Sequence, residues 1–215
     1  MPDFRLHCFC QSGNAYKAAL MLALCGADWE AAFVDYFNGE TRTSEWRETL
    51  NPLGEVPVLE HGDKRIGQSG VILTYLARHF GKFGGQNQDD ELEILRWMLF
   101  DNHKFTSYFA TYRFLYSLSA QPGDPAVMAF LKSRADAAFA VVDKHLATHS
   151  FLVGGRPTIA DISLAGYVFF SEEEHGYDFA ASHPGIHGWK ERLMALPGWT
   201  GPYALMPGEK FLAPR

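Results

Sequence analysis

The 215-residue sequence has few of the features that mark secreted or membrane-spanning proteins. It contains three cysteines, Cys8, Cys10 and Cys25, and no Cys-x-x-Cys pair. Three cysteines cannot form a closed disulfide framework, so we expect reduced thiols and a cytoplasmic protein. The apolar run 18–25 is far shorter than the ~20 residues of a membrane span. The first residues, MPDFRLH, mix acid and base before this run, so we expect no signal peptide.

An excess of positive charge is also absent. Lys and Arg number 19 against 25 Asp and Glu, which gives a formal net charge of −6. This balance argues against nucleic acid or an anionic membrane surface as the main partner. With 47% apolar and 20% charged residues, the chain is an ordinary globular protein rather than a disordered or collagen-like one. At ~150 residues per domain, one or two domains are expected.

Residues 1–80 alternate short strand-like runs with helices. A helix over 15–25 ends at Gly26, and His61-Gly62-Asp63 is typical of a hairpin turn. The predicted order is β-α-β-α-β-β-α with a sheet that mixes parallel and antiparallel pairs. The predicted strands are 4–9, 29–36, 56–60 and 64–66, and the predicted helices are 15–25, 44–50 and 69–80.

The remainder of the chain contains no convincing strand. Residues 81–88, GKFGGQNQ, have the composition of a linker. Apolar spacing predicts helices over 89–119, 126–147 and 184–196. Thr158-x-x-Asp161 is a capping-box pattern before an apolar run that reaches Phe170. We therefore predict an α/β domain over 1–80, a linker over 81–88 and an all-helical domain over 89–215.

The junction between the first strand and the first helix carries a candidate site for an anion. The unpaired N–H groups at a helix start favour a negative group such as a thiolate. Ser12 and Asn14 are the polar side chains nearest this end. Alternatively, one of them only caps the helix.

Two further local patterns lie in the same part of the chain. Pro57 stands at the head of a strand, and a cis bond there would leave the main chain of Val56 free to pair with an extended peptide. From the residues alone an ordinary trans edge proline is the alternative. Gln68-Ser69 begins the next helix and offers an amide and a hydroxyl to a carboxylate, although Ser69 can equally be a helix cap.

In order and spacing these features resemble the cytosolic glutathione S-transferase family over essentially the whole chain. The most specific pieces are Asn51-Pro52-x-Gly54-x-Val56-Pro57-Val58-Leu59, Gln68-Ser69 and Gly154…Thr158-Ile159-Ala160-Asp161, and Ser12-Gly13-Asn14-Ala15-Tyr16-Lys17 resembles the first helix start of many bacterial members.

The resemblance implies a thioredoxin-like domain followed by an all-α domain, and a detoxification enzyme that binds glutathione as co-substrate without a metal. Val56 would pair with the cysteinyl unit of glutathione beside a cis Pro57. Gln68 and Ser69 would hold its γ-glutamyl carboxylate. Ser12, with Asn14 as a second donor, would then stabilise the thiolate that attacks a small hydrophobic electrophile.

Two other functions remain open for the same fold. Some members use a cysteine at the first helix start, so Cys10 is a rival to Ser12 for a glutathione-dependent disulfide reductase or peroxidase. Cys10 precedes Ser12 by two residues, and a cysteine in a buried strand is usually inert. The second alternative is a non-catalytic ligand carrier or assembly module.

The resemblance also implies a homodimer, with the electrophile held by the helical domain. Within the predicted helix 89–119 an unusually polar segment begins at Asp101. Its candidates for substrate contact are Asn102, His103, Thr106 and Tyr108, and a solvated helix face is the alternative interpretation. Glu172-Glu173-Glu174 is interpreted as a solvated acidic edge.

Overall fold

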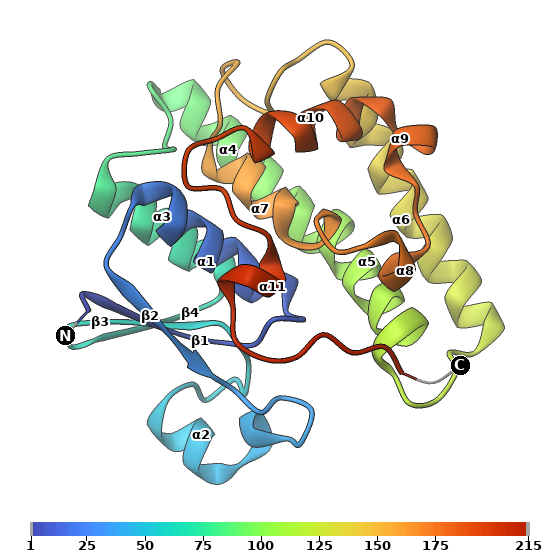
Figure 1. Cartoon of the computed structure of the whole chain (residues 1–215). Coiled ribbons are helices and arrows are strands. Elements are labelled where there is room, and N and C mark those ends of the chain that lie inside the picture. Colours follow the sequence, from blue (N-terminus) through green and yellow to red (C-terminus); the bar gives the residue numbers. More distant parts are fainter. Residues whose placement is uncertain (1, 214–215) are drawn as a thin grey trace. The chain divides into compact units, whose positions relative to one another are not determined.

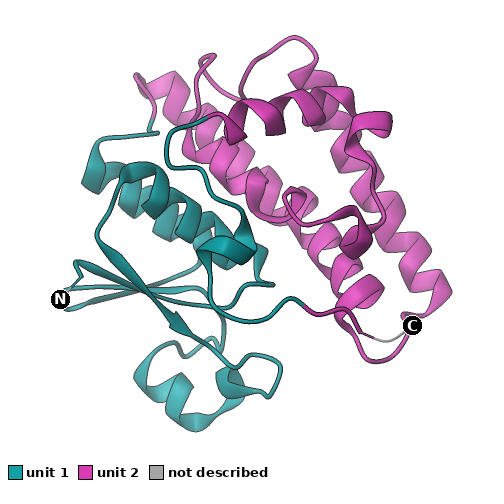
Figure 2. Ribbon diagram, in the orientation of Figure 1, with its two compact units in different colours: residues 1–84, 196–210 teal, residues 85–195, 211–215 magenta. Residues whose placement is uncertain are grey.

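The computed structural model describes residues 2–213 and divides the chain into two units (Figure 2). Unit 1 comprises Met1–Gly84 and Leu196–Lys210, and unit 2 comprises Gly85–Ala195 and Phe211–Arg215. Among the described residues no helix has both the length and the apolar character needed to cross a lipid bilayer.

Unit 1 is a four-stranded mixed sheet with helices on both faces (Figure 1). The sheet order is β2-β1-β3-β4; β1 and β2 are parallel, and the other pairs are antiparallel. The predicted order of strands and helices is therefore confirmed. The elements are β1 (Phe4–Cys8), α1 (Gly13–Cys25), β2 (Trp29–Phe33), a 3₁₀ turn (Glu40–Arg42), α2 (Ser44–Thr49), β3 (Val58–His61), β4 (Lys64–Gly67), α3 (Ser69–Phe80) and α11 (Pro202–Leu205).

The two faces of β1 bury different clusters, as the two-residue period of a strand requires. Phe4 packs against the ring of Phe80 at the end of α3, with 5.7 Å between ring centroids. On the opposite face His7 meets the indole of Trp46 from α2, 5.9 Å away. The helices α1 and α3 pack against each other beside this sheet. This packing brings the start of each helix to the same region of unit 1.

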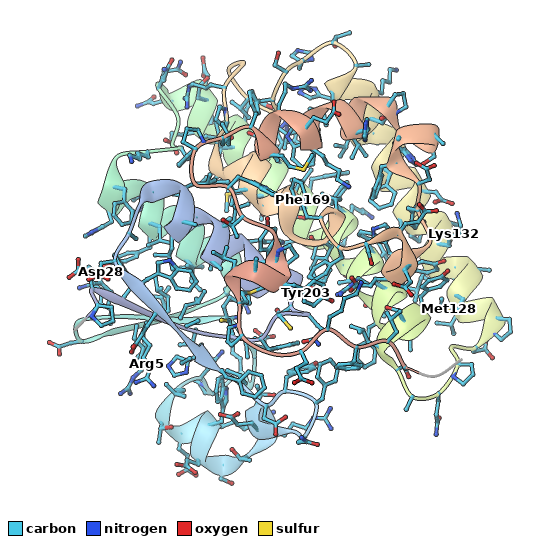
Figure 3. The ribbon with its side chains drawn as sticks, viewed as in Figure 1. Arg5, Asp28, Met128, Lys132, Phe169 and Tyr203 are labelled. Atoms are coloured by element: carbon cyan, nitrogen blue, oxygen red, sulfur yellow. The ribbon has the colours of Figure 1, made fainter. Side chains whose placement is uncertain are left out.

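The C-terminal segment 196–210 belongs to unit 1, which differs from the predicted helical domain over 89–215. The reason is a set of hydrogen bonds that residues just before α1 donate to main-chain carbonyls of this segment. The N–H of Cys10 donates to the carbonyl of Pro207 (2.9 Å), and the Gln11 side chain donates to the carbonyl of Glu209 (2.6 Å). The helix α11, which includes Tyr203 (Figure 3), lies within this segment and contacts α1.

Unit 2 is helical. Where one helix was predicted over 89–119, the structure has two helices interrupted by wider π-helical turns. The elements are α4 (Gln88–Phe100), a π turn (Asp101–Phe105), α5 (Thr106–Arg113), a second π turn (Phe114–Leu118), α6 (Pro125–Leu146), α7 (Ile159–Val168), α8 (Glu172–His175), α9 (Phe179–Ser182) and α10 (Pro184–Met194).

The capping box predicted at Thr158 is confirmed and organises the centre of unit 2. The buried Asp161 carboxylate accepts hydrogen bonds from the Thr158 N–H, the Leu152 N–H and the Trp189 indole, each at 2.9 Å. These bonds tie the start of α7 to the preceding loop and to α10. The motif therefore has a folding role, as its sequence pattern indicates.

The prediction that residues 172–174 form a solvated acidic edge is wrong for Glu174. This side chain is fully buried and forms an ion pair with Arg113 of α5, whose guanidinium also lies over the ring of Phe170. Burial of a carboxylate requires such a partner because an isolated buried charge is very costly.

Candidate active site

Ser12 is the N-cap of α1. Its hydroxyl oxygen accepts a hydrogen bond from the N–H of Ala15 (3.1 Å), and its carbonyl accepts from Tyr16. A hydroxyl has two acceptor lone pairs and one proton to donate. The cap uses a lone pair, whereas stabilising a thiolate would use the proton. Within the described residues the Ser12 proton has no acceptor, so the capping and thiolate interpretations are compatible.

The start of α1 also presents unpaired main-chain donors. The N–H groups of Gly13 and Asn14 find no acceptor among residues 2–213, and the first turn contains no acidic side chain. Such a helix end carries a partial positive charge because the peptide dipoles align along the axis. It therefore favours an anion.

The start of α3 has the same character. Val71 and Ile72 donate their N–H groups to the carbonyl of Gln68, whereas those of Ser69 and Gly70 have no partner in the described part of the chain. No acidic residue lies in this first turn and no side chain caps it. Gln68 adopts φ +65°, a conformation uncommon for residues other than glycine.

A side-chain contact joins the two helix starts. The Ser69 hydroxyl donates to Oδ1 of Asn14 over 3.5 Å, a long hydrogen bond. The Asn14 amide group has no acceptor within residues 2–213. The sequence prediction placed Ser12, Asn14, Gln68 and Ser69 near one ligand, and unit 1 brings these residues together.

A strip of main chain, residues 55–57, lies beside the start of α3. The Val56–Pro57 bond is cis, as the family resemblance implies, and Val56 is half-buried. Its N–H and carbonyl make no hydrogen bond within the described residues. Free main-chain groups next to a strand can pair with an extended peptide.

Sequence reasoning missed how this strip is held. The side chain of the buried Asn51 donates to the carbonyl of Glu55 (3.0 Å) and accepts from the N–H of Leu53 (3.0 Å). Gly54, at φ +68°, lies so close to Arg47 and to the carbonyl of Thr41 that a Cβ would come within 3 Å of each. In the sequence, the pattern Asn-Pro-x-Gly indicates this turn.

A second residue missed by sequence reasoning is Glu55. Its carboxylate accepts a hydrogen bond from the amide nitrogen of Gln68 (2.5 Å), so a negative charge lies beside the start of α3. The contact spans 13 residues and depends on the conformation of Gln68, which no local pattern indicates.

Cys10, the rival to Ser12, is completely buried. Its thiol donates to the side-chain oxygen of Gln11 (3.2 Å), and the backbone of Gly208 is packed against its sulfur. Burial also raises the pKa of the neighbouring Cys8 thiol to about 12. Buried thiols in such surroundings are inert, which disfavours thiol–disulfide chemistry at this position.

The four candidates in unit 2 have different surroundings. Asn102 and His103 are exposed on the π turn, and the ring of Tyr108 packs edge-on against Phe130. Thr106 is buried and donates its hydroxyl to the carboxylate of Asp101 (2.5 Å). This bond favours a structural role for Thr106, and substrate contact by the other three stays a prediction.

Within residues 2–213 no three histidine, cysteine or acidic side chains gather as metal ligands would. His145 and His149 stack face to face, 4.1 Å apart, and the carbonyl of Leu152 lies within hydrogen-bond distance of His145. Contacts with each other and with the main chain therefore hold both rings.

The chain belongs to the glutathione S-transferase family. Residues 3–78 match the family model described as the glutathione S-transferase N-terminal domain, and residues 125–192 match the C-terminal domain. A glutathione S-transferase structure from Pseudomonas fluorescens is 30% identical, covers 94% of this chain and 99% of its own, and superposes with a TM-score of 0.85. A Phanerochaete chrysosporium glutathione transferase, solved with oxidized glutathione, is 25% identical over 92% of both chains, with a TM-score of 0.82.

Relatives with another role also match. Elongation factor 1-gamma of Prunus avium is 30% identical over 170 residues, which cover 77% of this chain and 39% of that protein. Membership of the family therefore defines the fold and the class of site, and leaves catalysis to be argued from the residues.

Proposed function

We propose that the protein is a glutathione transferase that ionises the thiol of glutathione and conjugates it to small hydrophobic electrophiles. The observation that carries this proposal is the pair of neighbouring helix starts with unpaired N–H groups beside the free main chain of Val56. The Phanerochaete relative, solved with oxidized glutathione, supports the same ligand.

In the proposed binding mode, each part of the site contacts a different part of glutathione. The main chain of Val56 pairs with the cysteinyl unit. The start of α3, with Ser69 and Gln68, holds the γ-glutamyl carboxylate. This arrangement directs the sulfur towards the start of α1, where Ser12 and Asn14 have donor groups to spare.

The interactions proposed at the start of α1 are strong enough to favour the thiolate of bound glutathione over the thiol. A free thiol has a pKa near ~8.5, and lowering it by roughly two units requires about 2.7 kcal/mol. A hydroxyl hydrogen bond to an anion contributes about 1.5–3 kcal/mol, and a helix end adds about 0.3–1 kcal/mol. Ser12 and the start of α1 can together supply this amount. The thiol proton passes to solvent and the thiolate attacks the electrophile. The sulfur–carbon bond forms as the leaving group departs or, in an addition, as the product takes a proton from solvent.

We further propose that the enzyme is a cytoplasmic homodimer. Within the described residues Cys8, Cys10 and Cys25 form no disulfide bond, which fits a reducing compartment. On α4 the side chains of Leu92, Leu95 and Leu99 are 66%, 52% and 61% exposed, an apolar stripe that a partner subunit would cover. Sedimentation should give twice the chain mass, and Leu95→Glu should yield monomers; a monomeric wild-type protein would refute the homodimer.

The elongation factor 1-gamma match favours one other function, a non-catalytic binding or assembly module. Two assays separate the possibilities: conjugation of glutathione to aryl halides and enones, and reduction of glutathione mixed disulfides. We expect conjugation that is lost in Ser12→Ala and retained in Cys10→Ser. Disulfide reduction lost in Cys10→Ser would instead favour a reductase, and glutathione binding without any turnover would favour the module.

A further inference from the structure

Lys190 of α10 differs from an ordinary surface lysine because its ammonium group lies over aromatic rings. Its Nζ is 4.9 Å from the centroid of the Phe179 ring of α9 and 5.6 Å from that of Phe169, which follows α7 (Figure 3). The side chain is half-buried. Within residues 2–213 it forms no hydrogen bond and no ion pair. A cation with three N–H donors is therefore held without an anionic partner in the described part of the chain.

Lys132 of α6 provides a comparison within the same unit. Its Nζ also lies 4.9 Å from a ring centroid, that of Tyr177, but it donates to the carboxylate of Asp136 (2.9 Å), and its side chain is 51% exposed. Lys190 has the ring contacts without the carboxylate. A cation–π contact contributes about 0.5–2 kcal/mol, whereas removing an ammonium group from water costs several kcal/mol. The surroundings of Lys190 therefore favour the neutral amine more than those of an exposed lysine do.

Burial accordingly lowers the pKa of Lys190 to about 8. The titratable groups that contact the same rings or the same helix are His175 on α8, Asp178 on α9, Asp143 on α6, and His183, His187 and Glu191 on α10.

These neighbours do not hold the charge on Lys190. Burial keeps His175 neutral. The carboxylate of Asp143 accepts from the N–H of Ile186 (3.0 Å), and that of Asp178 accepts from a main-chain N–H of its own helix (3.0 Å). Glu191 lies 3.6 Å from the imidazole one turn before it. The amine of Lys190 can therefore lose its proton near neutral pH without breaking an ion pair.

We propose that Lys190 is a site of covalent acylation, which accepts the acyl group of a thioester in preference to the other lysines of residues 2–213. The lone pair of Nζ attacks the carbonyl carbon of the thioester. The carbon–sulfur bond breaks, the sulfur leaves as a thiolate, and the amine proton passes to solvent. The product is an amide, which removes the positive charge that the apolar surroundings disfavour.

The test is the initial rate at which acetyl-coenzyme A acetylates each lysine of the folded full-length protein. Peptide mass spectrometry measures these rates between pH 6.5 and pH 9.5. At pH 7.4 an amine with a pKa of about 8 is ~20% neutral, against ~0.1% for an ordinary lysine with a pKa of ~10.4. A weaker base is also a weaker nucleophile, so only part of this difference reaches the rate.

We expect Lys190 to react about tenfold faster than Lys132 at pH 7.4, with a rate that levels off near pH 9. In concentrated urea, where the rings no longer surround the amine, the two rates should become similar. The variant Lys190→Arg should lose the fastest site of acetylation, and the control Lys132→Arg should retain it.

Three outcomes would overturn the inference. The first is a rate at Lys190 equal to or below that at Lys132 in the folded protein. The second is an advantage of Lys190 that persists in urea, because local sequence rather than the folded surroundings would then cause it. The third is a rate at Lys190 that still rises tenfold per pH unit up to pH 9.5, because the amine would then have an ordinary basicity.

Discussion

At the scale of single residues, Ser12 combines two roles that can be separated by substitution. Ser12→Ala removes the cap acceptor and the donor together, so we expect a loss of about 1 kcal/mol in unfolding free energy and a raised pKa of the bound glutathione thiol. Ser12→Asp restores an acceptor for the Ala15 N–H but has no proton to donate. Its stability should return while the thiol pKa stays high.

Urea unfolding measures the first effect, and thiolate absorbance against pH measures the second. If Ser12→Asp lowered the pKa of the bound thiol to the wild-type value, the hydroxyl would not be the thiolate donor. Asn14, whose amide has donors to spare, would then be the next residue to replace.

A second prediction concerns His175, which is buried at the end of α8. Burial lowers the pKa of its imidazole to about 4, and its ring nitrogens lie within hydrogen-bond distance of the Phe170 carbonyl and the Tyr177 N–H. Because the unfolded chain takes up this proton near pH 6.5, stability falls as the pH drops below that value. We expect about 1 kcal/mol to be lost between pH 7 and pH 5.5 through this residue.

The measurement is the unfolding free energy of wild-type protein and His175→Gln at both pH values. The variant should lose less stability than the wild-type protein over this interval. Parallel pH profiles for the two proteins would contradict a neutral, buried His175.

At the scale of elements, short helices depend on single buried contacts more than on their own length. α8 has four residues, and Glu174 joins it to α5 through Arg113. Glu174→Gln would remove the carboxylate that neutralises the buried Arg113 charge, so we expect a loss of about 3–5 kcal/mol. Glu172→Gln, on the exposed side of the same helix, should change stability by less than about 0.5 kcal/mol.

Thermal and denaturant unfolding measure the unfolding free energies of these two variants and of the wild-type protein. Similar stabilities for Glu174→Gln and Glu172→Gln would mean that the buried pair contributes little, and that packing alone holds α8 in place.

The regular elements could be predicted from sequence because their signals are local. Gly26 ends α1, the turn at Gly62 joins β3 to β4, and Thr158 begins α7. The short helices were missed because four residues carry too little periodicity. For α8 a signal did exist: Ser171-x-x-Glu174 forms a capping box in the structure.

The candidate site also contains some features with local sequence signals and others without them. The helix starts at Ser12 and Ser69 were predictable because apolar periodicity marks both helices, and the cap residue Ser12 marks the first. The contact of Glu55 with Gln68 and the burial of Cys10 depend on tertiary packing. No pattern within a few residues of these positions encodes such contacts.

At the scale of the whole molecule, the chain returns to its first unit after the helical one. Segment 196–210 encloses Cys10 from a distance of almost 200 residues in sequence, and composition gave no sign of this. Gly208 makes the close approach possible: at φ +117°, its Cβ position lies 3.0 Å from the Cys10 sulfur and 3.4 Å from the Phe33 ring.

We therefore expect Gly208→Ala to cost about 1–3 kcal/mol in stability and to expose Cys10 to thiol reagents. The control is Gly201→Ala, at φ −70° in the same segment, where the nearest atom to a Cβ is 3.8 Å away. The rate of thiol modification and the unfolding free energy are measured together. A slow, unchanged Cys10 reaction in Gly208→Ala would show that this contact does not enclose the thiol.

The most direct test of the central claim is calorimetric titration of the wild-type protein and Gln68→Ala with reduced glutathione. We expect one saturable site per chain in the wild-type protein and weaker binding in Gln68→Ala, because the start of α3 would lose its donor side chain. Absence of measurable binding by the wild-type protein, or equal affinity in the two proteins, would contradict a glutathione site at the paired starts of α1 and α3.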